Sequence, residues 1–275
     1  MSGFAALGFN KSQPLSGYES QILNPGSCIP YPAMPHTLFI SDLHLSATHP
    51  LSSERFLHFA KHIDPQAEAL YILGDLFEYW AGDDDLDDPF HRTITSTLRK
   101  LSEQGIQIYL MHGNRDFLMA EKLARACNAT LLNDPTMLDL YGTPTLISHG
   151  DALCTDDDAY QAFRRQVRST SWQQQFLAQP LAQRKKQIEQ LRQQSEQEKR
   201  LKQMSIMDVS TNTVSALLRD HGYPRLIHGH THRPARHLHH LDGHNCERWV
   251  LGDWDTKANA LRCDSSGIRW ETIPV

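Results

Sequence analysis

The 275-residue sequence has no long hydrophobic run, no excess of basic residues and few cysteines. No apolar stretch approaches the roughly 20 residues that a helix needs to cross a bilayer. The N-terminus has no charged region followed by an apolar run, so no signal peptide is expected. The 27 Lys and Arg stand against 32 Asp and Glu, which gives a net charge of −5. Nucleic acid is therefore not an expected partner.

The cysteines are odd in number, scattered, and never spaced as Cys-x-x-Cys. This pattern is typical of reduced thiols in the cytosol rather than of a disulfide framework. The five residues are Cys28, Cys127, Cys154, Cys246 and Cys263.

Residues 1–35 differ in composition from the rest of the chain. They contain five prolines and four glycines, almost no charge and no apolar periodicity. We expect a poorly ordered leader with no catalytic part. The remaining residues, 36–275, are long enough for one domain, with a helical insertion at about 151–220.

Five short apolar runs contain β-branched or aromatic residues, as buried strands do. They cover residues 37–40, 69–73, 106–111, 145–148 and 225–228. Helical patterns at residues 54–63 and 90–103 lie between some of them. Strands that alternate with helices predict an α/β fold.

Each of these runs ends at Asp, His or Asn, usually beside Gly. Ligand sites in α/β sheets lie beyond the carboxyl ends of the strands, so the five loops are expected to converge. Oxygen and imidazole donors without thiolates suit Mn²⁺, Fe²⁺ or Zn²⁺. Seven donors can serve two metals if Asp75, which stands alone on its loop, bridges them. The donors are Asp42, His44, Asp75, Asn114, His149, His230 and His232.

Two other clusters of possible ligands have simpler explanations. The sequence has 16 histidines, and those at residues 237–244 lie in a polar stretch that predicts a solvated loop. The acidic run at residues 83–88 lacks the glycine and the closing glutamate of a calcium loop. A solvated acidic loop is expected there.

The region from about 151 to 220 is rich in Gln and Arg and helical in pattern. Residues 160–202 contain ten Lys or Arg and three Glu, a local net charge of +7. One interpretation is a solvated helical pair. The other is a lid that binds an anionic substrate, since the basic segment follows directly after a predicted ligand loop.

The ordered set of donors resembles the calcineurin-like metallophosphoesterase superfamily. The resemblance implies a β-sandwich flanked by helices, with a dimetal site at the strand ends. It assigns one metal to Asp42, His44, Asp75 and His232, and the other to Asp75, Asn114, His149 and His230. Arg115 departs from the pattern, because the superfamily usually has His there. A guanidinium binds and stabilises phosphate but cannot act as an acid at neutral pH, so the leaving-group acid stays open.

Further motifs resemble a narrower family, the UDP-2,3-diacylglucosamine pyrophosphatases of bacterial lipid A synthesis. The motifs lie at residues 41–45, 73–78, 112–117, 149–151, 153–157, 160–164, 206–209 and 227–234, and the likeness extends over about residues 37–273. It implies two Mn²⁺ per chain and catalytic roles for Asp75, Asn114 and Arg115. The expected reaction is attack of a metal-activated water on the α-phosphorus, which yields UMP and 2,3-diacylglucosamine 1-phosphate.

The same resemblance implies a helical lid over the site and contacts to the lipid substrate. The contacts fall at Asn114, Arg115, Asp157, Tyr160, Arg192, Ser195, Lys199, Lys202 and His230. It also implies peripheral attachment to the cytoplasmic face of the bacterial inner membrane, with no protein partner.

Two other functions remain possible from the residues alone. A dimetal phosphoesterase could act on a soluble dinucleotide or cyclic nucleotide. The chain could also be a metal-dependent binding or scaffold module, although all seven donor positions hold competent ligands.

Overall fold

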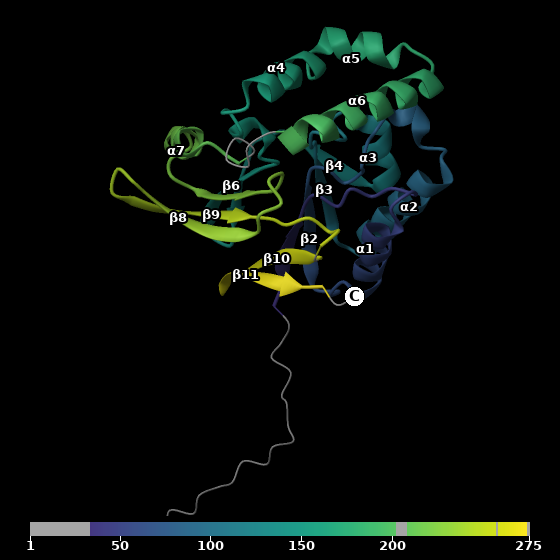
Figure 1. The fold of residues 1–275 in the computed structure, drawn as a ribbon. Helices are drawn as coiled ribbons and strands as arrows, with labels where there is room; N and C mark the ends of the chain where they lie inside the picture. The colour runs from purple at the N-terminus through teal and green to yellow at the C-terminus, as the bar shows by residue number, and fades with distance from the viewer. Residues whose placement is uncertain (1–33, 202–207, 257, 274–275) are drawn as a thin grey trace, which may run out of the picture. The chain divides into compact units, whose positions relative to one another are not determined.

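The computed structural model describes residues 34–201, 208–256 and 258–273, with the side chains of residues 194–201 left out. The predicted leader thus lies almost wholly outside the described residues. The strands of this part form two sheets (Figure 1). The first has the order β11 (Gly267–Thr272), β10 (Asn259–Asp264), β1 (His36–Ile40), β2 (Ala67–Leu73), β3 (Gln107–Met111) and β4 (Ala129–Leu132).

The second sheet has the order β5 (Thr136–Leu140), β6 (Thr143–Ser148), β7 (Arg225–His228), β9 (His244–Val250) and β8 (Ala235–Leu241). Strands β1 to β4 pair in parallel, as do β6 and β7. The carboxyl ends of neighbouring parallel strands lie at the same edge of their sheet.

The alternation of side chains along the strands separates two hydrophobic layers. Phe39 of β1 packs with Tyr71, Ile147 and Ile227 in a cluster drawn from both sheets, which is the interior of a sandwich. Its neighbour Leu38 points the other way, into a cluster shared with the helices. Each central strand is therefore buried on both faces, as its continuous apolar sequence predicts.

Helices cover the outer faces of the sandwich. The helices α1 (Pro50–His62), α2 (Pro89–Glu103) and α3 (Glu121–Cys127) pack on the first sheet. The α2 helix begins where the Asp88 side chain accepts a hydrogen bond from Phe90 N and Pro89 occupies the first turn. On the second sheet, Val214 and Leu218 of α7 (Thr211–Asp220) pack against Leu146 and Leu226.

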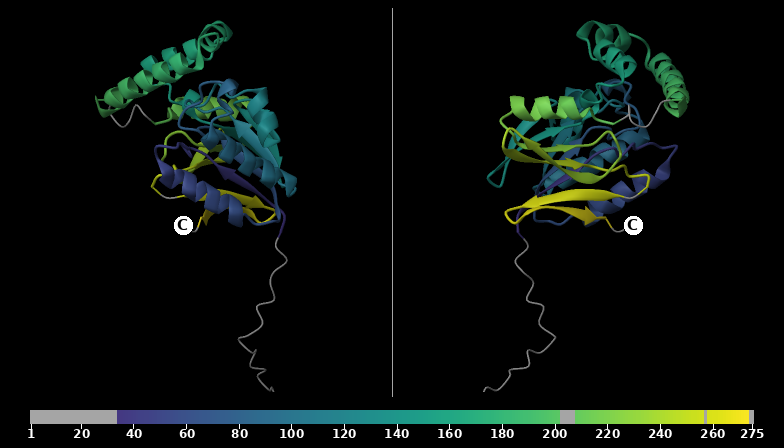
Figure 2. Two further views of the ribbon diagram at one scale, coloured as in Figure 1. Left: turned by 90° about the vertical axis from the view of Figure 1, so that its right-hand side faces the viewer. Right: turned by 60° about the vertical axis from the view of Figure 1, so that its left-hand side comes forward.

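Three further helices, α4 (Asp158–Val167), α5 (Thr170–Leu177) and α6 (Leu181–Leu201), lie together at one end of the sheets (Figures 1 and 2). They fall inside the predicted insertion, whereas α7 belongs to the layer on the second sheet. The insertion is fixed to the sandwich partly by Phe176, which is buried in the same cluster as Trp80 and Leu118.

The architecture predicted from the sequence, a β-sandwich flanked by helices, is confirmed. The five predicted strands correspond to β1, β2, β3, β6 and β7, and the two predicted helices to α1 and α2. The prediction of a solvated loop at residues 237–244 is wrong, because these residues form the β8–β9 hairpin. The four described cysteines, Cys127, Cys154, Cys246 and Cys263, are buried free thiols. No described helix is long and apolar enough to span a membrane.

Candidate dimetal site

The predicted metal donors lie on loops that follow five strands. Asp42 and His44 follow β1, Asp75 follows β2, and Asn114 follows β3. His149 follows β6 in the second sheet, and His230 and His232 follow β7. The carboxyl ends of strands from both sheets thus supply one site, as the sequence pattern predicts.

Five of these residues have a left-handed backbone. The φ angles are 55° at Asp42, 50° at His44, 52° at Asp75, 68° at His230 and 55° at His232. Positive φ is uncommon outside glycine, although Asp and His tolerate it better than most residues. Such clustering of strained backbone is typical of functional sites, where the surrounding fold holds the conformation.

A first group of donors consists of Asp42, His44, Asp75 and His232. His44 Nε2 lies 3.3 Å from His232 Nε2 and 3.8 Å from Asp75 Oδ2. His232 Nε2 also lies 3.3 Å from Asp42 Oδ1. Among the described residues, this buried Asp42 oxygen has no hydrogen-bond partner. Two imidazole nitrogens and an unsatisfied carboxylate oxygen form a suitable environment for a cation.

A second group consists of Asp75, Asn114, His149 and His230. Asn114 Oδ1 lies 3.0 Å from His149 Nε2 and 2.8 Å from His230 Nδ1. His149 Nε2 is 3.9 Å from Asp75 Oδ1. Asp75 lies near both groups, and Asp42 of the first group also accepts the backbone N–H of His230 in the second at 2.8 Å. Asp42, Asp75 and His149 also offer ligand atoms close enough together to hold one ion. The donors therefore fit two metals, with Asp75 between them.

The orientation of His149 is fixed by the fold. Its Nδ1 donates a hydrogen bond to the carbonyl of Leu73 at 2.9 Å, which leaves Nε2 facing Asn114. A metal-ligating histidine commonly has its second nitrogen held in this way. Gly113 passes so close to Asp75 that a Cβ atom there would collide with the carboxylate. Only glycine lets the two loops approach so closely.

The two imidazoles of the second group have opposite pKa shifts. Burial lowers the pKa of His149, but the Asp75 and Asp42 carboxylates outweigh it and raise this pKa to about 9. Burial and the charge of His149 lower the pKa of His230 to about 4. His230 is therefore neutral at pH 7, whereas His149 must release a proton before it can bind a metal.

Two buried carboxylates connect the donor loops to each other and to the insertion. The sequence analysis did not single them out. Asp116 accepts hydrogen bonds from the backbone N–H groups of Leu76, Phe77 and Gly113, so it joins the loop of Asp75 to that of Asn114. Burial and the Asp75 charge raise the pKa of Asp116 to about 7, while the N–H donors oppose this shift.

The second missed carboxylate, Asp151, lies two residues after His149 and is fully buried. Its Oδ2 accepts hydrogen bonds from the Tyr160 hydroxyl and from Arg164 Nε, both at 2.8 Å. Burial alone would raise the pKa of this carboxyl, but His149, Arg168 and Arg164 lower it well below the usual range. Asp151 thus ties α4 of the insertion to a donor loop.

Several predicted substrate contacts lie near the donors. The Tyr160 ring stacks on His230 with 5.9 Å between ring centroids. Arg115 donates its backbone N–H to Asp75 Oδ1 at 2.8 Å, and its guanidinium lies 3.6 Å from Glu78. Arg192 of α6 contacts the same Glu78 carboxylate at 2.6 Å.

The remaining predicted contacts are Asp157, Ser195, Lys199 and Lys202. Asp157 caps α4 by accepting a hydrogen bond from Tyr160 N at 3.1 Å. Ser195 and Lys199 belong to the part of α6 whose side chains are not described, and Lys202 lies outside the described residues.

The acidic run after β2 is not the solvated loop expected from its composition. Asp85 is 3% exposed, and its carboxylate lies 2.7 Å from Lys185 Nζ. Asp84 pairs with Arg184, a side chain that is only 1% exposed. Asp83 accepts hydrogen bonds at the start of α3 and from Trp80. The run fixes α6 of the insertion to the sandwich.

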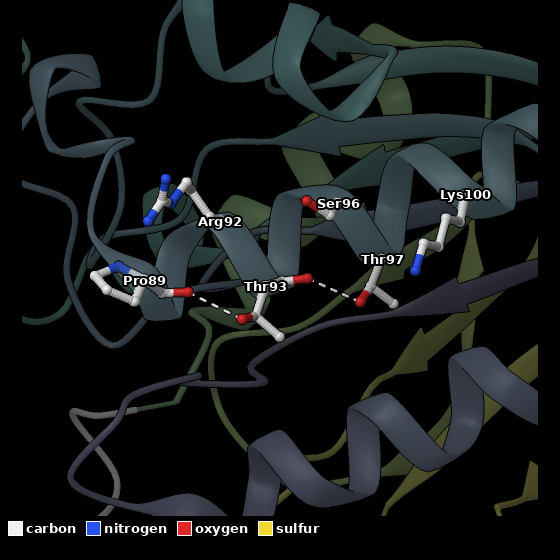
Figure 3. Close-up of a pocket in the computed structure, with 6 residues that line it drawn as sticks. All are labelled: Pro89, Arg92, Thr93, Ser96, Thr97 and Lys100. Atoms are coloured by element: carbon white, nitrogen blue, oxygen red, sulfur yellow. Dashed lines mark hydrogen bonds between the residues drawn. The ribbon is translucent and has the colours of Figure 1, made fainter.

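A depression of about 430 Å³ runs along α2 (Figure 3). It is lined by Pro89, Arg92, Thr93, Ser96, Thr97 and Lys100, none of which is a predicted site residue. The Thr93 and Thr97 hydroxyls donate to carbonyls one turn earlier in the helix. The predicted metal donors lie instead at the strand ends.

A family model described as calcineurin-like phosphoesterase matches residues 35–234. The chain belongs to this family, and the class predicted from the donor pattern is confirmed. Its relatives include proteins named UDP-2,3-diacylglucosamine hydrolase. One from Aromatoleum aromaticum is 53% identical over 230 residues, which cover 84% of this chain and 94% of the relative.

Two further relatives carry the same name. One from Edwardsiella ictaluri is 48% identical over 86% of this chain and 92% of its own length. One from Pseudomonas aeruginosa is 48% identical over 86% of this chain and 99% of its own length. The narrower family predicted from the sequence motifs is therefore also confirmed.

Proposed function

We propose that the chain hydrolyses the pyrophosphate bond of UDP-2,3-diacylglucosamine, with UMP and 2,3-diacylglucosamine 1-phosphate as products. The observation that carries this proposal is the dimetal donor set with two guanidinium groups, Arg115 and Arg192, gathered beside it on one carboxylate. A guanidinium group can donate two parallel hydrogen bonds to one phosphate. Two such groups next to a dimetal site therefore suit a substrate with two linked phosphates. The names of the relatives supply the substrate.

We further propose that both metals are Mn²⁺. Asp42, His44, Asp75 and His232 would hold one ion, and Asp75, Asn114, His149 and His230 the other. When bound, such a metal pair supplies an ionised water as the nucleophile and neutralises charge on the phosphoryl oxygens. The mixed carboxylate, amide and imidazole ligands are of the kind that Mn²⁺ accepts.

The residues of the chain bind and orient the diphosphate. Arg115 follows a metal donor directly, so its guanidinium can contact the reacting phosphoryl group through two nitrogens. Attack at the α-phosphorus releases a sugar 1-phosphate, which is a stable anion at neutral pH. The reaction therefore does not depend on a strong acid at the position that Arg115 occupies.

The insertion helices are proposed to act as a lid that binds the acyl chains. Phe163, Leu177 and Leu191 are each about two-fifths exposed, at 39%, 41% and 41%. Ile188, by contrast, packs against the core. Each acyl methylene that leaves water for such apolar surface contributes about 0.8 kcal/mol. The proposal includes peripheral association with the cytoplasmic face of the bacterial inner membrane, where such a lipid is dissolved.

The test compares substrates. Purified protein with Mn²⁺ is given UDP-2,3-diacylglucosamine, a soluble dinucleotide or a cyclic nucleotide, and products are separated by chromatography. We expect UMP and the lipid 1-phosphate from the first, at a kcat/KM at least about 100-fold above the others, because remote binding energy positions the diphosphate. Preferred turnover of a soluble nucleotide would favour the alternative phosphoesterase instead.

A further inference from the structure

The Glu78 side chain connects three groups that come from different parts of the chain. It follows the metal donor Asp75 by three residues and is largely shielded, with a 15% exposed side chain. Its Oε2 lies 2.9 Å from His44 Nδ1. Its Oε1 lies 2.6 Å from Arg192 Nη2 and 3.6 Å from Arg115 Nη1.

The contact with His44 concerns the metal donors. The other ring nitrogen of His44, Nε2, faces His232 and Asp75 at 3.3 Å and 3.8 Å. If Nε2 binds a metal, the ring must carry its proton on Nδ1 and can donate it to Glu78 Oε2. A carboxylate in this position fixes the ring orientation and makes the imidazole a better ligand.

The contact with Arg192 concerns the insertion. Arg192 lies on α6, eight residues after Arg184, the buried side chain that fixes the start of this helix to residues 81 and 84. A second carboxylate, Glu189 of the same helix, lies 3.0 Å from the other terminal nitrogen of Arg192. Glu78 and Glu189 therefore share one guanidinium, but only Glu78 also contacts a metal donor.

Both Glu78 oxygens have nitrogen partners, since Oε2 lies beside His44 and Oε1 beside Arg192. A carboxylate in a poorly solvated position holds such partners more strongly than a neutral amide would.

We propose that Glu78 is a positioning residue that couples helix α6 to the metal site, with one oxygen on His44 and the other on Arg192. The inference deepens the proposed function and rests on it for the role of the metals. With its Nε2 held by a metal, His44 would keep its proton on Nδ1 and donate it to Glu78 Oε2, which would leave Oε1 directed at Arg192. Since binding equilibria are linked reciprocally, docking of α6 also strengthens metal binding.

The experiment measures amide hydrogen exchange in peptides from residues 181–193, with and without saturating Mn²⁺ and without substrate. In wild-type protein, Mn²⁺ is expected to slow exchange in α6 by about 5-fold or more. In Glu78→Gln the slowing should disappear. Competition with a chelator should show Mn²⁺ affinity about 10–100-fold lower in this variant.

Glu189→Gln is the matched control, because it removes a carboxylate from the same arginine without touching His44. Both the Mn²⁺ affinity and the Mn²⁺-dependent slowing of exchange should stay at the wild-type values. Equal losses in Glu189→Gln and Glu78→Gln would mean that any reduction of charge beside Arg192 has this effect, and would overturn the proposal.

Hydrogen exchange in the wild-type protein alone can also overturn the proposed coupling, whether or not Glu78→Gln folds. If saturating Mn²⁺ leaves exchange in α6 unchanged, Glu78 does not connect the helix to the metals. No substrate takes part, so this failure differs from failure of the proposed function. If Mn²⁺ slows exchange in α6 but the protein does not turn over UDP-2,3-diacylglucosamine, the role of Glu78 would stand. The proposed substrate would then be wrong.

Discussion

Asp75 has the central position among the individual donor residues. It contacts His44 of the first group and His149 of the second, and its side chain is buried. Its Oδ1 also accepts the backbone N–H of Arg115. A single carboxylate thus lies between the two proposed metal positions and also accepts the N–H of Arg115, the proposed phosphate-binding residue.

Replacement of Asp75 by alanine should lower kcat by at least about 100-fold, because both metals lose a ligand. His44→Ala should have a smaller effect that excess Mn²⁺ partly reverses, since its metal keeps three donors. Metal content per chain, measured by mass spectrometry beside turnover, checks the ranking. Near wild-type turnover in Asp75→Ala would refute the bridging assignment.

A buried histidine beside the site predicts how stability depends on pH. His228 Nε2 accepts a hydrogen bond from Arg248 Nη1 at 3.0 Å, and its Nδ1 donates to Gly229 O. Burial first and the Arg248 charge second lower the pKa of His228 to about 3. Between pH 6.5 and this value, the unfolded chain binds a proton that the folded chain does not.

The free energy of unfolding should therefore fall as the pH is lowered through this window. The contribution of His228 is at most about 1.4 kcal/mol per pH unit. Urea unfolding in EDTA at pH 7.5, 6.5 and 5.5 measures it in wild type and in His228→Gln. The pH dependence should be shallower in the variant, and identical slopes would contradict the assignment.

The sequence predicts the metal donors better than the residues that hold them. His44 and Asp75 stand at strand ends in a recognisable order, and the structure brings them together. Glu78, Asp116 and Asp151 lie inside the family motifs, but the motifs do not reveal their role. A carboxylate that accepts backbone N–H groups or pairs with a distant arginine follows no fixed spacing. Their partners lie up to 114 residues away in the chain.

At the scale of secondary-structure elements, the central strands were predictable and the edges were not. The strands β1, β2 and β3 are buried on both faces, which makes them continuous apolar runs. The β8 strand lies at the edge of its sheet and is largely exposed, so its histidine-rich sequence resembles a loop. The acidic run was misjudged because its partners, Arg184 and Lys185, lie about 100 residues further along the chain.

The attachment of α6 should depend on Arg184. Its guanidinium donates to the carbonyls of Ala81 and Gln179 and pairs with Asp84. Arg184→Met should weaken the docking of α6 by about 2 kcal/mol, because charged hydrogen bonds are lost. At saturating Mn²⁺, where the weaker docking of α6 no longer limits metal content, turnover of UDP-2,3-diacylglucosamine should fall. Metal content and any hydrolysis of bis(p-nitrophenyl) phosphate should not fall under these conditions.

Lys186→Met is the control for this change, because Lys186 is exposed on the same helix. Its turnover should match that of the wild type. Equal loss on both substrates in Arg184→Met would show that α6 supports the whole fold rather than recognition of the lipid.

At the scale of the whole molecule, the loops of the two sheets are proposed to supply the chemistry and the insertion to supply the recognition of the lipid. The seven proposed metal donors all follow strands of the sandwich, whereas Tyr160 and Arg192 come from α4 and α6. The connections between the two parts run through Asp151, Glu78 and the acidic run. Substitutions in the insertion away from these connections are therefore expected to change substrate recognition without changing metal binding.

The most direct measurement is turnover of UDP-2,3-diacylglucosamine in ¹⁸O-labelled water, with Mn²⁺ and with EDTA-treated protein. With Mn²⁺, the label should enter the phosphate of UMP, because water attacks the α-phosphorus. Metal-free protein should give no turnover, since the donor set has no other means of ionising the water. Label in the sugar 1-phosphate, or undiminished turnover after EDTA treatment, would contradict the account.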